Sequence, residues 1–197
     1  MDMYRQNRKS KSFKWVLSIT MVLSLLCSCK LYDGNAKRMG NFSLRLDKSG
    51  NRAMVESWTW SGDLNDTLIE IPDKYEDKAT IDAIGGSTGA NASLQKFTIL
   101  PGPDVLFRNG SGYAEDMEVP SVVFTFRIGK NIQEINVNFT GTSYAQVVMK
   151  DGSTTLYKVY IRVECSEENP VYYSENGKLY LRDRDILVTS FPYPEST

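Results

Sequence analysis

The sequence of 197 residues contains no histidine. Catalysis by a Ser-His or Cys-His pair is therefore excluded, because both need an imidazole base, and so is any zinc site with an imidazole ligand. Cysteine is also scarce, since Cys27, Cys29 and Cys165 are too few and too unevenly spaced for a disulfide framework. The remaining composition, with 41% hydrophobic, 24% charged and 11% aromatic residues, is that of an ordinary globular protein.

A basic segment followed by an apolar run opens the chain. Residues 1–14 hold five Lys and Arg against one Asp, and residues 15–26 are apolar except for Ser18, Thr20 and Ser24. This order is typical of a signal peptide. Twelve helical residues would span about 18 Å, whereas the hydrocarbon core of a bilayer is about 30 Å thick, so a permanent spanning helix is the weaker interpretation.

The residues that end this run, Leu26-Cys27-Ser28-Cys29, resemble the lipobox of bacterial lipoproteins. That motif has an aliphatic residue, a tolerant position, a small residue and then the cysteine that receives the lipid. Ser28 supplies the small residue before Cys29, whereas Leu26 occupies that place before Cys27. The resemblance implies a signal peptide of residues 1–28 and lipid attachment at Cys29, with more than one acyl chain holding the protein on the extracytoplasmic side of a bacterial cell membrane. A soluble secreted protein is the alternative.

The chain after residue 28 is mildly acidic. Residues 29–197 carry 18 Lys and Arg against 23 Asp and Glu, a net charge of −5, with no basic stripe. Nucleic-acid binding needs clustered cations opposite the phosphate backbone, so no nucleic-acid partner is expected.

No motif for a cofactor, a metal or a catalytic nucleophile is present. Residues 85–89 (GGSTG) match the spacing of a hydrolase nucleophile elbow but lack the histidine base, and a turn is the simpler interpretation. Residues 63–67 (DLNDT) resemble the start of a calcium-binding EF-hand loop, yet Leu68 stands where glycine is required. We therefore expect no cofactor, no metal site and no enzyme activity.

Strand patterns cover the rest of the chain, and no window there has a helical period. Residues 29–40 lack periodicity and are expected to form the lipidated cysteine and a short tether, which leaves residues 41–197 as a single all-β domain. Strands are predicted at residues 42–46, 53–60, 67–71, 79–84, 94–100, 121–128, 132–139, 144–149 and 155–164. The turn at residues 48–51 and the dipeptides Asp151-Gly152 and Asn176-Gly177 predict hairpins.

Three segments resemble the leucine-rich repeat modules of BspA-type bacterial surface proteins: TLIEIPDKYEDKATIDAIGG, ASLQKFTILPGPDV and ENPVYYSENGKLYLRDRDILVTSFP. Those modules combine an Ile-Pro, Tyr, Ile-Gly unit with a Ser-Leu-x-x-Ile-x-Ile-Pro unit and a Tyr-Ser-x-x-Gly-x-Leu-Tyr segment. The resemblance implies a leucine-rich-repeat-like β-solenoid of short strands with hairpins, in which residues 69–71 and 97–100 are lateral neighbours. Residues 101–120 read as an irregular insertion, and an antiparallel β-sandwich is the alternative fold.

Trp58 and Trp60 are the candidate ligand-binding residues. They lie two positions apart on one strand and therefore share a face, where they could stack on a sugar ring or on a protein surface; core packing is the alternative. The insertion at residues 101–120 is a second candidate. With the exposed role implied by the repeat resemblance, the sequence predicts a lipid-anchored cell-envelope protein that binds a protein or glycan. A structural envelope component without its own ligand is the alternative, followed by a hydrolase.

Replacing Cys29 by alanine is expected to abolish labelling of the exported protein with a palmitate analogue, because the lipid is attached to that thiol. Cys27→Ala is the matched control and should keep the wild-type label, since this position of the lipobox tolerates substitution. Equal label in the wild type and in Cys29→Ala would contradict the assignment of the anchor.

Overall fold

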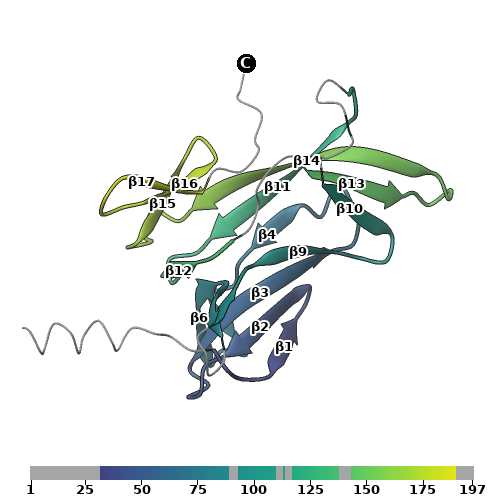
Figure 1. Ribbon diagram of the computed structural model, residues 1–197. Coiled ribbons are helices and arrows are strands. Elements are labelled where there is room, and N and C mark those ends of the chain that lie inside the picture. The colour runs from purple at the N-terminus through teal and green to yellow at the C-terminus, as the bar shows by residue number, and fades with distance from the viewer. Residues whose placement is uncertain (1–31, 89–92, 110–112, 114–116, 138–142, 190–197) are drawn as a thin grey trace, which may run out of the picture. The chain divides into compact units, whose positions relative to one another are not determined.

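The computed structural model describes residues 32–88, 93–109, 113, 117–137 and 143–189. The chain divides into two compact units, residues 1–30 and residues 31–197, and every described residue belongs to the second. In the described residues all regular elements are strands, which confirms the all-β class (Figure 1). The same residues include no helix of the length and apolarity that crossing a bilayer requires.

The larger of two main sheets is mixed. Its strands follow the order β1-β2-β3-β6-β12, and β5 also pairs with β6. Strand β9 pairs with residues 57–60 of β3, beyond the residues 52–55 that pair with β6. Neighbours are antiparallel from β1 to β3, and β3 pairs in parallel with both β6 and β9. The strands are β1 (Ala36–Met39), β2 (Phe42–Leu46), β3 (Arg52–Trp60), β5 (Lys74–Tyr75), β6 (Ala79–Ile84), β9 (Thr98–Pro101) and β12 (Glu134–Ile135).

The second main sheet has the order β10-β13-β14-β11-β4. Here β10, β13 and β14 are antiparallel neighbours, whereas β14, β11 and β4 run in parallel. The strands are β4 (Leu68–Glu70), β10 (Val105–Asn109), β11 (Ser121–Ile128), β13 (Ser143–Val148) and β14 (Thr154–Cys165). Two small antiparallel sheets complete the described fold, one of β7 (Gly86–Thr88) and β8 (Ser93–Gln95), the other of β15 (Tyr172–Glu175), β16 (Lys178–Leu181) and β17 (Ile186–Thr189).

The predicted hairpins are confirmed. Asn176 and Gly177 connect β15 to β16 with φ of 50° and 73°, the pair of positive values that a two-residue hairpin turn requires and that Asn-Gly accepts at low cost. The turn with Asp151-Gly152 joins β13 to β14, and the turn at residues 48–51 joins β2 to β3. Local turn chemistry therefore decided these connections.

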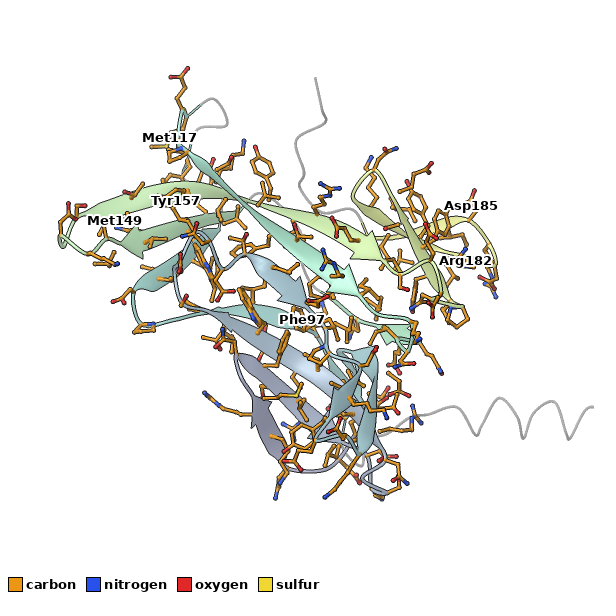
Figure 2. The ribbon with its side chains drawn as sticks, turned by 180° about the vertical axis from the view of Figure 1, so that it is seen from behind. Phe97, Met117, Met149, Tyr157, Arg182 and Asp185 are labelled. Carbon is orange, nitrogen blue, oxygen red and sulfur yellow. The ribbon has the colours of Figure 1, made fainter. Side chains whose placement is uncertain are left out.

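Aromatic side chains join the two main sheets in one hydrophobic core. Trp60 of β3 lies edge-on to Phe124 of β11, with ring centroids 5.0 Å apart, and Trp58 contacts the same ring at 6.0 Å. Phe97 is fully buried and packs edge-on against Phe126 of β11, at 5.2 Å (Figure 2). Edge-to-face contacts at these distances are favourable beyond the area that they bury.

A β-bulge makes this core possible. Ser57 pairs with Ser43 of β2 but Val55 pairs with Leu44, so Glu56 is one extra residue in β3. The extra residue shifts the alternation, and Val55 and Trp58 therefore face the same core although they are three positions apart. Glu56 itself is buried and accepts a charge-assisted hydrogen bond from Nε of Arg45.

The domain begins earlier than the sequence indicates. Residues 36–39, expected to belong to a tether, form edge strand β1 against β2. Tyr32 is fully buried and bridges to Thr88. The expected boundary at residue 41 is therefore too late, because the pairing of β1 depends on a partner strand that local periodicity does not reveal.

The expected lateral pairing of residues 69–71 with 97–100 is wrong. Strand β4 pairs with β11 in one sheet, whereas β9 pairs with β3 in the other. Stacked coils of a solenoid are not seen among the described residues, and the antiparallel sandwich is also too simple, because both main sheets contain parallel pairs. Aliphatic residues beside Pro or Gly mark a short strand without specifying its neighbour.

The stretch expected to be an irregular insertion also contains regular structure. Residues 105–109 form β10, the edge strand beside β13, with Val105 buried opposite Val147. Residues 110–112 and 114–116 lie outside the described residues.

Truncating Phe124 to alanine is expected to destabilise residues 29–197 by about 3–5 kcal/mol, because it removes the ring that both Trp58 and Trp60 contact and leaves a cavity. Urea unfolding followed by tryptophan fluorescence measures the change. Leu106→Ala is the matched control, since Leu106 is 47% exposed on β10, and it should cost less than about 0.5 kcal/mol. Equal losses in the two variants would contradict this account of the core.

Candidate functional site

Trp58 and Trp60 are core residues. Their side chains are 2% and 0% exposed, and the indole Nε1–H of Trp60 donates to the carbonyl oxygen of Asp63 at 3.0 Å. Neither ring presents a face on which a ligand could stack. Of the two roles that the sequence allows for this pair, burial supports core packing. Cys29, the expected lipid site, lies outside the described residues.

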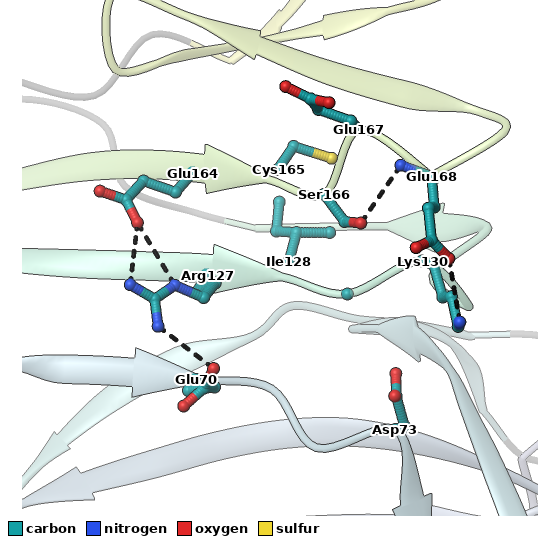
Figure 3. Close-up of a pocket in the computed structure, with 11 residues that line it drawn as sticks. Glu70, Asp73, Arg127, Ile128, Lys130, Glu164, Cys165, Ser166, Glu167 and Glu168 are labelled. Atoms are coloured by element: carbon teal, nitrogen blue, oxygen red, sulfur yellow. Dashed lines mark hydrogen bonds and ion pairs between the residues drawn. The ribbon is translucent and has the colours of Figure 1, made fainter.

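A pocket of about 550 Å³ lies where three parallel strands end (Figure 3). Strands β4, β11 and β14 run side by side in the same direction, and their last residues and following loops line it. Cross-strand register sets Arg127 of β11 between Glu70 of β4 and Glu164 of β14. The sheet therefore brings together residues that are far apart in the sequence.

The lining of the pocket is polar and acidic. Five carboxylates line it with two cations, a formal charge of −3. Arg127 donates to Glu164 at 3.1 and 3.3 Å and to Glu70 at 3.2 Å, and Lys130 donates to Glu168 at 2.9 Å. These carboxylates raise the pKa of Arg127 and of Lys130, so both stay charged at neutral pH. The carboxylates that line the pocket are Glu70, Asp73, Glu164, Glu167 and Glu168.

A buried amide holds two loops of the pocket together. The Nδ2 group of Asn169 donates to the carbonyl oxygens of Gly129 and Ile132, at 2.8 and 3.0 Å. Its Oδ1 accepts the backbone N–H groups of Val171 and Tyr172, at 2.9 and 2.8 Å. Because the buried amide uses both donors and its acceptor, the loop after β11 is fixed to the loop after β14.

Cys165 is a half-buried residue that lines the pocket, and its thiol is not activated as a nucleophile. Burial raises the pKa of its thiol to about 11, and Sγ lies 3.6 Å from the carbonyl oxygen of Tyr172. Only the thiolate is a strong nucleophile, so at neutral pH this side chain behaves as a small apolar group. The pocket can therefore bind through hydrogen bonds and charge.

The other segments singled out in the sequence have structural roles. Residues 63–66 form a turn in which Asp63 Oδ1 accepts the N–H of Asn65 at 2.9 Å. Gly86, expected in a turn, begins β7, and a Cβ there would lie 2.6 Å from a carboxylate oxygen of Glu134. Across the described part of the chain, no group of three or more Asp, Glu or Cys is arranged to hold a metal ion.

Comparison with protein-family models, with curated proteins and with solved structures finds no match for this chain. The function proposed below therefore rests on the geometry of the chain itself.

Sequence reasoning missed this pocket because its parts are ordinary in isolation. Glu70, Arg127 and Glu164 each look like a charged residue on the outer face of a strand, and only the parallel register places them side by side. Asn169 stands before Pro170, which indicates a turn but gives no sign of burial.

Alkylation of Cys165 by iodoacetamide at pH 8 is expected to be at least about a hundredfold slower than alkylation of an unperturbed thiol. With a pKa of about 11, only about a thousandth of the Cys165 side chain is thiolate at this pH. The rate should rise about tenfold per pH unit up to pH 10. Mass spectrometry of a Cys27→Ala/Cys29→Ala variant isolates this thiol, and the same variant in urea is the control. Rapid alkylation of the folded protein at pH 8 would show a reactive cysteine.

Proposed function

We propose that this protein is a lipid-anchored component of the bacterial cell envelope that binds a ligand without transforming it. The pocket at the ends of β4, β11 and β14 is the observation that supports a binding role. Ligand sites often form where neighbouring parallel strands end, because the following loops can diverge while the strands stay fixed.

The chemistry of the pocket favours a neutral or cationic ligand with many hydrogen-bonding groups. Carboxylates accept hydrogen bonds, the guanidinium of Arg127 donates them, and the formal charge of −3 repels anions. A glycan presenting hydroxyl groups or a basic segment of a protein has these properties. Ile128 adds an apolar patch to the lining, against which a sugar ring or an aliphatic side chain could pack.

Anchoring and binding fit together in this proposal. The sequence up to Cys29 supports export and lipidation, and the described part of the folded unit begins only three residues later, at Tyr32. A lipid anchor confines the domain to the membrane surface, where weak individual contacts gain strength from high local concentration. Low affinity per site is therefore compatible with adhesion.

The double variant Asp73→Asn/Glu167→Gln should weaken binding at least about tenfold, because it removes two acceptor charges and preserves the ion pairs of Arg127 and Lys130. The detergent-solubilised lipoprotein would be tested on a glycan array and in pull-downs from envelope extracts. Asp104→Asn/Glu118→Gln removes the same charge beside the starts of β10 and β11, and should keep affinity within about twofold.

The outcomes separate the candidate functions. Binding that is unchanged in Asp73→Asn/Glu167→Gln would place the ligand outside the pocket. Absence of binding to every glycan and envelope component would favour a structural envelope protein without its own ligand.

A further inference from the structure

We propose that the folded domain rests directly on an anionic phospholipid surface, with edge strand β1 and the β2–β3 turn toward the lipid headgroups. This orientation rests on the lipid anchor proposed above. It assigns a second, electrostatic contact with the membrane to a cationic surface made of Lys37 and Arg38 of β1 and Lys48 of the β2–β3 turn.

Only a short length of chain lies between the anchor and the described fold. Only Lys30 and Leu31 separate Cys29 from Tyr32, and three residue steps reach at most about 11 Å. Tyr32 cannot be pulled out of the fold cheaply, because its ring is fully buried and its N–H donates to the carbonyl oxygen of Ser87 at 3.1 Å. A lipid on Cys29 therefore holds this end of the domain within about 11 Å of the anchored residue.

A buried polar network fixes Tyr32 further. Its hydroxyl donates to Oδ1 of Asp82 at 2.6 Å, and Nε of Arg52 donates to Oδ2 of the same carboxylate at 2.6 Å. Arg52 also donates to the Tyr32 hydroxyl oxygen at 3.2 Å. Burial is the main cause that raises the pKa of Tyr32, and the hydrogen bond to Asp82 is the second. The phenol therefore keeps the proton that it donates to Asp82.

Charge is distributed unevenly along the chain after the anchor. Residues 30–52 contain six Lys and Arg against two Asp, whereas residues 53–197 contain twelve Lys and Arg against twenty-one Asp and Glu. The segment next to the anchor is therefore net +4 by sequence and the rest of the domain net −9. Because Arg45 and Arg52 pair with Glu56 and Asp82 of the second group, the excess left to the segment is +2. Cations beside a lipid anchor add to membrane affinity where the leaflet that holds the anchor carries anionic headgroups.

The cations of this segment differ in whether they face solvent. Arg45 and Arg52 point inward, to Glu56 and Asp82. Lys37 and Arg38 lie exposed on β1, which is the edge of its sheet (Figure 1).

Lys48 and the neighbouring turn complete this end of the domain. Lys48 is 80% exposed, and its Nζ lies 3.3 Å from Asp33, the residue after Tyr32, which places it beside the anchored end. The β5–β6 turn lies next to the β2–β3 turn, because the N–H of Thr80 donates to the carbonyl oxygen of Asn51 at 2.9 Å. Strand β5 and this turn together, residues 74–78, contain two lysines and two acids and have no net charge, although the turn itself, residues 76–78, is net −1.

Amine footprinting of the full mature lipoprotein tests the orientation. The protein would be reconstituted in phosphatidylglycerol-rich vesicles, in phosphatidylcholine vesicles and in neutral detergent, and then acetylated with a neutral active ester. We expect acetylation of Lys37 and Lys48 to be at least about fivefold slower in the anionic vesicles than in detergent, with the protection lost in 1 M salt. Lys150 and Lys178, which lie on β-hairpins of other sheets, should change less than twofold.

Charge variants test the electrostatic part. Lys37→Gln/Arg38→Gln should remove most of the protection of Lys48 in anionic vesicles, whereas Lys150→Gln/Lys178→Gln should leave it intact. Cations on an edge strand also discourage pairing with another chain. That role alone would not make the acetylation of Lys48 depend on anionic lipid.

The lipid on the N-terminal peptide is identified by mass spectrometry on the same sample. A mature protein without lipid on Cys29 overturns the proposed anchor and this orientation together. Lipid on Cys29 combined with equal acetylation of Lys37, Lys48 and Lys150 in all three environments overturns the orientation alone.

Discussion

The contact of Trp58 and Trp60 with Phe124 is the interaction on which the rest of the described fold depends. It joins the two main sheets, and it exists only because the bulge at Glu56 shifts the side-chain alternation of β3. Without the extra residue, Val55 and Trp58 would point to opposite faces of the sheet. One face of β3 supplies the common core, while Met54 on the other face packs with Tyr32 and Ala83.

Buried charges lie on the second face of the larger sheet, on β3 and β6. Glu56 and Asp82 are both nearly inaccessible, and each is met by an arginine, Arg45 and Arg52 respectively. A buried carboxylate without such a partner would be costly, so the pairs are a condition of burying this face at all. The network around Asp82 also includes Tyr32, and it thereby ties the residues that follow the proposed anchor to the centre of the sheet.

The proposed ligand pocket and the proposed membrane surface lie on different sheets. The pocket is built on the five-stranded sheet and carries a formal charge of −3, whereas Lys37, Arg38 and Lys48 lie on the edge and turn of the seven-stranded sheet. Opposite charges on separate elements allow one part of the domain to face anionic lipid while the other stays available to a ligand. One hydrophobic core contains residues of both sheets.

The sequence by itself determined the features that are local in origin. Strand periodicity decided the all-β class, and the Asn176-Gly177 dipeptide decided its hairpin, because positive φ values are a property of those residues. The tertiary structure alone decided whether Trp58 and Trp60 face the core or the solvent, since alternation shows that two residues share a face without showing which face is covered. It also decided that residues 36–39 pair as a strand and that Glu70, Arg127 and Glu164 meet. Parallel and edge pairings of this kind join segments that are distant in the chain, and no local pattern encodes the choice of partner.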